Sequence, residues 1–241
     1  MDNKEIQSER NQIVVKHNDL IQKSRYSLTM QEQKIILYLI SKIKPEDTDL
    51  HLYEFDIKEF CEICGIDETS GKNYSVLKET IINLKRKCFW VSIGNGIDAT
   101  VSWIDKAIVN KRSGAIKIKL DNDMKPFLLE LQRNFTRYEL NCVLTMKSKY
   151  SIRLYELLKS YEFMTTRTFN LEQLKLLLSV EKYENYKDFR SRVLEPALRE
   201  INLYSDIVVT YEAKKKGKKY DNIMFGIKEK NNVERFLNSR R

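Results

Sequence analysis

Residues 185–202 read NYKDFRSRVLEPALREIN, and a shorter stretch at 73–78, NYSVLK, matches the beginning of that segment. Asn-Tyr opens both stretches, and Leu77-Lys78 aligns with Phe189-Arg190 at an offset of 112 residues. In both, apolar residues recur every three or four positions, which predicts an amphipathic helix. The match indicates that the chain contains one structural unit twice.

The elements predicted around these two helices also occur in the same order. Phe55-Asp56-Ile57 matches Phe169-Asn170-Leu171, a short strand followed by a residue that can cap a helix. In the first half the pattern predicts helices over 29–43, 57–64 and 74–87 and strands over 51–55, 89–93, 99–110 and 115–120. In the second half it predicts helices over 148–163, 171–180 and 186–202 and strands over 168–170, 207–211 and 220–227.

Helix, strand, helix, turn, helix and hairpin is the order of a winged helix, whose third helix presents one face to the DNA major groove. The sequence therefore predicts an α+β fold of two tandem winged-helix domains related by internal duplication. We expect these domains over 10–132 and 133–228, with flexible tails at 1–9 and 229–241. One mixed domain with accidental self-similarity is the alternative.

Length and composition narrow the class of protein. The 241 residues suffice for one large domain or two smaller ones, and 42% hydrophobic with 32% charged residues excludes a disordered or fibrous chain. No apolar run approaches the roughly 20 residues of a membrane-spanning helix, and the N-terminus has no apolar segment of a secretory signal. We expect a cytoplasmic protein that does not associate with membranes.

The net charge of +9 favours a polyanionic partner, and its distribution is uneven. From Tyr186 to the C-terminus there are 14 Lys and Arg against 8 Asp and Glu. Two thirds of the positive excess therefore lies in the final quarter of the chain, which contains the third predicted helix of the second module (its recognition helix) and the hairpin that follows it.

The four cysteines do not form a metal-binding pattern. Cys61 and Cys64 make one C-x-x-C pair, but Cys88 and Cys142 stand alone, and the chain has only two histidines. A zinc ribbon needs a second close pair of ligands. We therefore expect no metal and no cofactor, with three of the cysteines buried and reduced, although a zinc or redox site at Cys61 and Cys64 is the alternative.

The second recognition helix has a distinct core face and a distinct exposed face. At 100° per residue, Phe189, Val193, Ala197 and Ile201 share the core side. Arg190 falls on that side too, where we expect it to curl toward a phosphate rather than a base. The outward candidates for DNA binding, with Tyr186 at the helix start, are Lys187, Ser191 and Arg192.

The first recognition helix is less basic, and the second hairpin is strongly basic. Leu77, Ile81 and Leu84 mark the core side of the first helix, whereas Glu79 faces outward and weakens the prediction that this helix contacts bases. Its DNA-binding candidates are Lys72, Asn73, Ser75 and Lys78. We expect the first module to bind DNA more weakly than the second, and a role in dimerisation is the alternative. The second hairpin carries Lys214, Lys215, Lys216, Lys218 and Lys219 around Gly217, which suits backbone phosphates or a minor groove. A solvated loop that only resists aggregation is the alternative for these lysines.

Three motifs resemble the iteron-type plasmid replication initiators over about residues 10–228. They are Leu28-Thr29-Met30-x-Glu32-Gln33-Lys34, Ser148-Lys149-Tyr150-Ser151-x-Arg153-Leu154-Tyr155-Glu156-Leu157-Leu158 and Phe189-Arg190-x-Arg192-Val193-Leu194-x-Pro196-Ala197-x-x-Glu200-Ile201-Asn202. Lys149 and Arg153, in the second motif, complete the DNA-binding candidates.

The resemblance implies a function that composition alone does not reach. Members bind direct repeats (iterons) at a plasmid origin as monomers and repress their own promoter as dimers through inverted repeats. It further implies a monomer–dimer equilibrium, with the host initiator protein and helicase as partners. The two recognition helices are then expected about one turn of DNA apart, roughly 34–36 Å.

Other functions fit the sequence less well. A rolling-circle nicking enzyme needs His-x-His, and an ATPase needs a Walker A motif; neither is present, so we expect no catalysis. No exposed aromatic motif typical of proteins that bind single-stranded RNA stands out. A plain transcriptional repressor with the same two modules remains an alternative.

Overall fold

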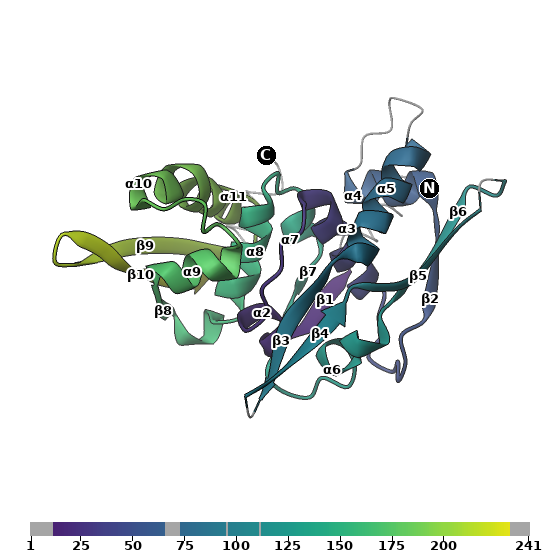
Figure 1. The fold of residues 1–241 in the computed structure, drawn as a ribbon, viewed down its shortest axis with the longest axis horizontal. Helices are drawn as coiled ribbons and strands as arrows, with labels where there is room; N and C mark the ends of the chain where they lie inside the picture. Colours follow the sequence, from purple (N-terminus) through teal and green to yellow (C-terminus); the bar gives the residue numbers. More distant parts are fainter. Residues whose placement is uncertain (1–11, 66–72, 95, 111, 232–241) are drawn as a thin grey trace.

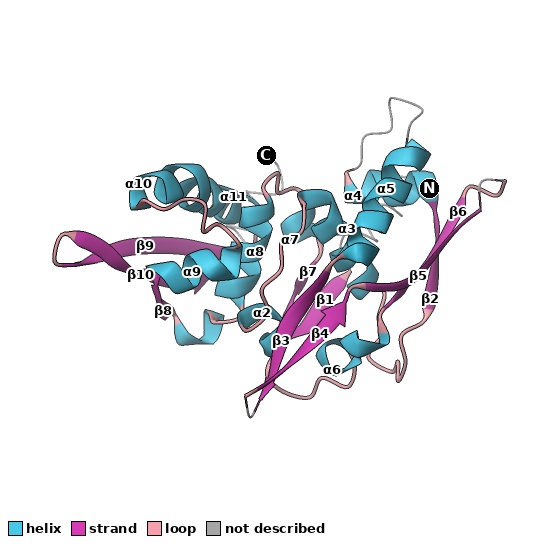
Figure 2. Cartoon of the chain, viewed as in Figure 1, coloured by secondary structure: helices cyan, strands magenta, loops and turns pink. Residues whose placement is uncertain are grey.

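Two similar modules lie side by side in the computed structural model, which describes residues 12–65, 73–94, 96–110 and 112–231 (Figure 1). Each module has a three-stranded sheet, and helices pack beside it (Figure 2). The first consists of α3 (Met30–Ile40), β2 (Leu52–Asp56), α4 (Ile57–Cys64), α5 (Asn73–Arg86), β5 (Ile104–Asn110) and β6 (Ala115–Leu120). The second consists of α8 (Lys149–Lys159), β8 (Thr166–Asn170), α9 (Leu171–Leu178), α10 (Tyr186–Phe189), α11 (Glu195–Tyr204), β9 (Ile207–Lys216) and β10 (Lys219–Glu229).

Sheet topology confirms the predicted internal repeat. The sheets have the strand orders β2-β6-β5 and β8-β10-β9, so in each module the last strand lies between the other two. The hairpins β5–β6 and β9–β10 are therefore equivalent, and each is the wing of its module. All the pairings in both sheets are antiparallel.

The matched tripeptides serve the same purpose in both modules. Asp56 Oδ1 accepts hydrogen bonds from the backbone N–H groups of residues 58 and 59, at 2.9 and 3.1 Å. Asn170 Oδ1 does the same for residues 172 and 173, at 3.1 and 3.3 Å. The flanking Phe55 and Phe169 are both buried in their cores. A strand is thus joined directly to a capped helix twice, which explains why these three positions match.

Local signals at the other helix ends are confirmed as well. Thr29 and Glu32 form a capping box, in which Glu32 N–H donates to Thr29 Oγ1 at 3.2 Å and Thr29 N–H donates to Glu32 Oε2 at 2.6 Å. Gly65 ends α4 with a φ of 65°, a left-handed conformation that glycine adopts without strain.

The strands of the first module differ from the prediction in one respect. The segment predicted as one strand over 99–110 is two strands, β4 (Ile97–Ser102) and β5, separated at Trp103, which is 1% exposed. β4 pairs with β3 (Cys88–Gly94) in a separate two-stranded hairpin. This hairpin is an insertion between the recognition helix and the wing, and the second module has none among its described residues.

The N-terminal segment forms elements that periodicity did not predict. β1 (Ile13–His17) leads into α2 (Asn18–Gln22) and pairs antiparallel with β7 (Phe135–Glu139). α6 (Lys125–Leu128) and α7 (Asn141–Leu144) flank β7. The boundary predicted between 132 and 133 thus falls just before a strand that pairs with the start of the chain.

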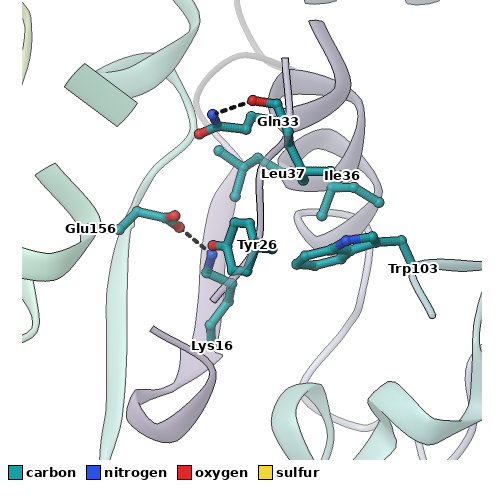
Figure 3. A pocket seen from close by; sticks show the side chains of 8 residues that line it. Lys16, Tyr26, Gln33, Ile36, Leu37, Trp103 and Glu156 are labelled. Atoms are coloured by element: carbon teal, nitrogen blue, oxygen red, sulfur yellow. Dashed lines mark hydrogen bonds and ion pairs between the residues drawn. The ribbon is translucent and has the colours of Figure 1, made fainter. Parts of the chain in front are cut away.

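A buried polar cluster joins the two modules. Lys16 of β1 forms an ion pair with Glu156 of α8, although both side chains are at most 2% exposed. The Tyr138 hydroxyl donates to the same carboxylate at 2.5 Å. Figure 3 shows Lys16 and Glu156 pointing toward each other beside Tyr26, at a cavity of about 10 Å³ that holds one water molecule at most. Such a cavity is too small for a substrate.

The predicted tails are only partly described. Residues 1–9 and 232–241 lie outside the described residues. The prediction of a tail from 229 is wrong at its start, because Lys230 is 4% exposed and its ammonium donates to the carbonyls of Asn202 and Ser205 at 2.7 and 2.6 Å. Within the described residues, no helix has the length and apolar character needed to cross a membrane.

Candidate nucleic-acid interface

The recognition helix of the second module presents its predicted core face to the interior. Phe189, Val193, Ala197 and Ile201 are at most 1% exposed. Asn185 caps the helix, because its side-chain oxygen accepts from Asp188 N–H at 2.8 Å. The opposite face, with Lys187, Ser191 and Arg192, is exposed as predicted.

Arg190 corrects the prediction based on a regular helix. A uniform 100° step places Arg190 on the core side, yet its side chain is 52% exposed. The reason is a π-helical turn over Arg190–Leu194, closed by a hydrogen bond from Glu195 N–H to the Arg190 carbonyl. Pro196 accounts for this turn, because proline lacks an N–H and its ring clashes with the carbonyl four residues earlier in an α-helix.

The π-helical turn brings Arg190 against Glu195. Arg190 Nε donates to Glu195 Oε1 at 2.7 Å, and the Tyr211 hydroxyl of β9 donates to the same oxygen at 3.2 Å. The hydrogen bond from Arg190 holds the pKa of Glu195 below its ordinary value, so the carboxylate stays ionised. The recognition helix and the wing thus share one polar contact.

An aromatic contact joins the same two elements at the helix start. The rings of Tyr186 and Tyr220 are 4.0 Å apart between centroids, with an interplanar angle of 31°. Lys215 places its ammonium 4.9 Å from the centre of the Tyr220 ring. Burial raises the pKa of Tyr186 to about 12, with a further contribution from Tyr211, so Tyr186 is neutral near pH 7.

The base of the wing is fixed to the recognition helix by Asn202. Its side chain accepts from Val209 N–H at 2.7 Å and donates to the Val209 carbonyl at 2.9 Å. These two bonds and the tyrosine contacts hold the wing beside the exposed face of the helix.

The five wing lysines lie on extended strands rather than in a long loop. β9 continues to Lys216 and β10 begins at Lys219, so only Gly217 and Lys218 form the turn. Lys216 lies opposite Lys219 in the register. Like charges directly opposite each other destabilise a hairpin. A polyanionic ligand removes that repulsion, which favours a binding role over a solvated loop.

The first module offers a weaker version of the same arrangement. Leu77, Ile81 and Leu84 of α5 are at most 4% exposed, and Ser75 and Lys78 are exposed together with Glu79. Lys72 and the side chain of Asn73 lie outside the described residues, so their predicted role stays a prediction.

The wing of the first module holds basic residues that the sequence analysis missed. Lys106 and Arg112 are exposed on or beside β5–β6. The turn Arg112-Ser113-Gly114 between the strands predicted over 99–110 and 115–120 indicates this hairpin in the sequence, but its basic residues were not among the predicted DNA-binding candidates.

Arg153 and Lys149, the two DNA-binding candidates from the second motif, have different environments. The prediction that Arg153 contacts DNA is contradicted by the structure, because Arg153 is 3% exposed. Its guanidinium lies 4.5 Å from the centre of the Tyr26 ring and donates to the Ser24 carbonyl at 3.0 Å. Arg153 therefore holds the modules together.

Lys149 remains a candidate for DNA binding because, unlike Arg153, it is only half-buried, at the start of α8. Burial lowers the pKa of Lys149, and the neighbouring Lys182 and Lys87 lower it further. Lys149 thus lies near two other lysines, of which Lys87 forms an ion pair with Glu32 at 2.5 Å.

The recognition helices lie toward the same edge of the molecule. In Figure 1, α5 and the α10–α11 helix both occupy the upper part of the view, with the wings β5–β6 and β9–β10 extending beyond them at opposite ends. The structure thus brings the helix and wing candidates of each module together and sets the two groups apart along the long axis.

No metal-binding geometry occurs in the described part of the chain, where no three His, Cys, Asp or Glu side chains cluster. Cys61, Cys64 and Cys142 are buried and Cys88 is exposed, and none of these four described cysteines forms a disulfide. Burial raises the pKa of Cys142 to about 12, which makes that thiol unreactive.

Comparisons with known proteins agree with this geometry. A family model described as "Initiator Replication protein, WH1" matches residues 13–159, and one described as "Initiator Rep protein, WH2" matches residues 170–227. A replication initiation protein of Escherichia coli is 27% identical over 228 residues, which span 89% of this chain and 69% of that protein. An Escherichia coli protein described as an uncharacterized 27.6 kDa protein is 20% identical over 239 residues, 91% of this chain and 96% of that one.

A solved structure, the Pi initiator protein in complex with iteron DNA, superposes with a TM-score of 0.72 at 18% identity. The likeness covers 92% of this chain and 99% of that one. At this identity it shows the shared fold. The predicted pair of tandem winged helices is confirmed, and by the match of both domain models the chain belongs to the initiator replication protein family.

Proposed function

We propose that this protein initiates plasmid replication by binding repeated duplex sequences, iterons, at the origin. The observation that carries the proposal is the joined helix and wing of the second module. Its exposed basic helix face and its lysine-tipped hairpin are held together by the Tyr186–Tyr220 and Glu195–Tyr211 contacts. The iteron complex of the structurally similar Pi initiator supports the choice of ligand.

The geometry suits duplex DNA in a particular way. The α10–α11 helix would enter a major groove and place Arg190, Ser191 and Arg192 near base edges. The wing lysines, with Lys187 and Tyr186 at the helix start, would contact phosphates on its flank, and each phosphate neutralised would release counterions. The weaker first module would occupy a neighbouring groove, with Ser75 and Lys78 toward the DNA.

We propose that the protein acts by binding alone, without catalysis, in the cytoplasm where plasmid DNA is replicated. The finer roles follow from the same surface. Bound to operator DNA, the protein would repress its own promoter. A monomer–dimer equilibrium would separate this repression from binding at the origin. At the origin, the protein would recruit a host initiator and a helicase. A magnesium-dependent nicking assay on supercoiled origin plasmid tests the first statement, and a cut product would contradict it.

A plasmid-maintenance experiment tests the replication role. The gene and its flanking DNA are joined to a selectable marker that lacks any other origin, and stable transformants are counted. Wild type should support maintenance. A Lys214→Gln, Lys216→Gln, Lys219→Gln variant should not, whereas Lys228→Gln should. Lys228 is a matched control, because it lies on β10 at the end opposite the wing tip.

The same experiment distinguishes a replication initiator from a plain transcriptional repressor. If the wild-type plasmid is not maintained while a promoter–reporter fusion is repressed by the same protein, the origin role is contradicted and a plain repressor is favoured. Direct repeats protected from nuclease in the flanking DNA would support the origin role independently.

A further inference from the structure

The pairing of Arg190 with Glu195 is unexpected for residues five positions apart. On a regular α-helix they would be separated by about 140° around the axis and could not meet. The π-helical turn over Arg190–Leu194 removes that separation and allows the 2.7 Å bond from Nε to Oε1. Both side chains are exposed, 52% for Arg190 and 38% for Glu195. A rigid arginine is thus held at the solvent-facing surface of the recognition helix.

The bond to Glu195 involves only one of the nitrogens of the guanidinium. Nε donates to the carboxylate, and within the described residues no hydrogen bond is recorded from the two terminal nitrogens of Arg190. Those two nitrogens form the pair that binds O6 and N7 of guanine in the major groove. Because Nε is bound to Glu195, the bidentate contact that remains open to Arg190 is the end-on one, made by its two terminal nitrogens.

We propose that Glu195 and Tyr211 are positioning residues that hold Arg190 for recognition of one guanine in the bound duplex. The inference rests on the proposed function and adds a base preference to it. It also replaces the phosphate contact that helix periodicity predicted for Arg190.

The carboxylate favours a base over a phosphate as the partner of Arg190. An ion pair with Glu195 cancels much of the arginine charge, and a carboxylate next to a phosphate would repel it. A guanine edge carries no net charge, so its recognition depends on the direction of the donors more than on the local charge. Tyr211 reaches Glu195 from the wing and so fixes the carboxylate from a second element.

The test measures base discrimination rather than affinity alone. A duplex is selected from a randomised library with the wild-type chain, and dissociation constants are measured for that duplex, for single G·C substitutions in it and for an unrelated duplex. Wild type should prefer one guanine by roughly five- to 150-fold. Arg190→Ala should abolish that preference while leaving discrimination at the other positions.

Two variants of Glu195 distinguish its role in positioning Arg190 from the effect of its negative charge on DNA affinity. Glu195→Ala and Glu195→Gln both remove a negative charge and should both raise affinity for the unrelated duplex. The glutamine retains an oxygen that accepts from Arg190 Nε, so Glu195→Gln should keep the guanine preference within about twofold, whereas Glu195→Ala should lower it about fivefold or more. Tyr211→Phe should lower the preference in the same direction.

Glu212→Gln is the matched charge control. Glu212 is exposed on β9 next to Tyr211, and its side chain is directed to the other face of the strand. It should raise affinity for the unrelated duplex and leave the guanine preference intact. Equal guanine preferences for Glu195→Ala and Glu195→Gln would overturn the proposal, as would an enriched site with no guanine dependent on Arg190. Failure to enrich any duplex would instead contradict the proposed function.

Discussion

Neutralising the lysines of the second wing should change the salt dependence of DNA binding. The five residues are Lys214, Lys215, Lys216, Lys218 and Lys219, each replaced by glutamine. Each phosphate neutralised by a protein cation contributes about 0.9 to the slope of log affinity against log salt. If three to five of these lysines contact phosphates, the slope should fall by about 2.7 to 4.5. Between 50 and 200 mM salt, wild type should then lose about 40- to 500-fold more affinity than the variant.

The structure also predicts that this variant folds. The lysines are exposed, and Lys216 lies opposite Lys219, so their replacement removes repulsion and the melting temperature should equal or exceed that of wild type. Fluorescence anisotropy on a selected duplex, at a series of salt concentrations, gives the slopes, and Lys228→Gln serves as the control. Parallel slopes for wild type and the five-lysine variant would refute the assignment of the wing to phosphates.

Three further predictions concern the recognition helix and the junction of the modules. Phe189→Ala should lower the free energy of unfolding by about 3–5 kcal/mol because the ring is fully buried. Chemical denaturation measures this change, and a free energy of unfolding equal to that of wild type would contradict the placement of Phe189 on the core face of the helix. Arg192→Ala should cost about 1–3 kcal/mol on the selected duplex, and an unchanged ratio of specific to non-specific affinity would assign Arg192 to phosphate. Lys16→Met should destabilise the protein by about 3–5 kcal/mol because it leaves the buried Glu156 carboxylate without its cation, whereas Lys16→Met with Glu156→Leu should recover much of the loss in the same denaturation assay.

The repeated elements could be predicted because their signals are local. A capping box at Thr29 and Glu32, a cap at Asp56 and a glycine at 65 lie within a few residues of the helix ends they determine. The core phase of each recognition helix follows from spacing alone, and the buried residues confirm it.

Other features depend on partners that are distant in sequence. β1 and β7 pair across more than 100 residues, and nothing near Ile13 in the sequence indicates that partner. Arg153 belongs to a motif with other polar residues, but its burial depends on Tyr26 and Ser24 from the opposite module. Periodicity within one helix cannot identify such contacts.

At the candidate site, prediction from the sequence is limited by a break in the helix periodicity. The exposed face with Lys187, Ser191 and Arg192 could be predicted, but Arg190 was assigned to the core side because a uniform 100° step ignores Pro196. A proline within a helical pattern is a local signal, and it would have indicated a break in the phase. The contact of Tyr211 with Glu195 requires the wing to fold back on the helix, which spacing does not reveal.

The central claim is that each module inserts a helix into duplex DNA, and groove-specific footprinting tests it most directly. On the selected duplex, guanine N7 atoms should be protected from methylation in two successive major grooves on one face, about 10–10.5 base pairs apart, with the stronger protection due to the second module. Arg192→Ala should weaken one protected segment only. Protection confined to a single groove, or equal binding of the corresponding single strands, would contradict the account.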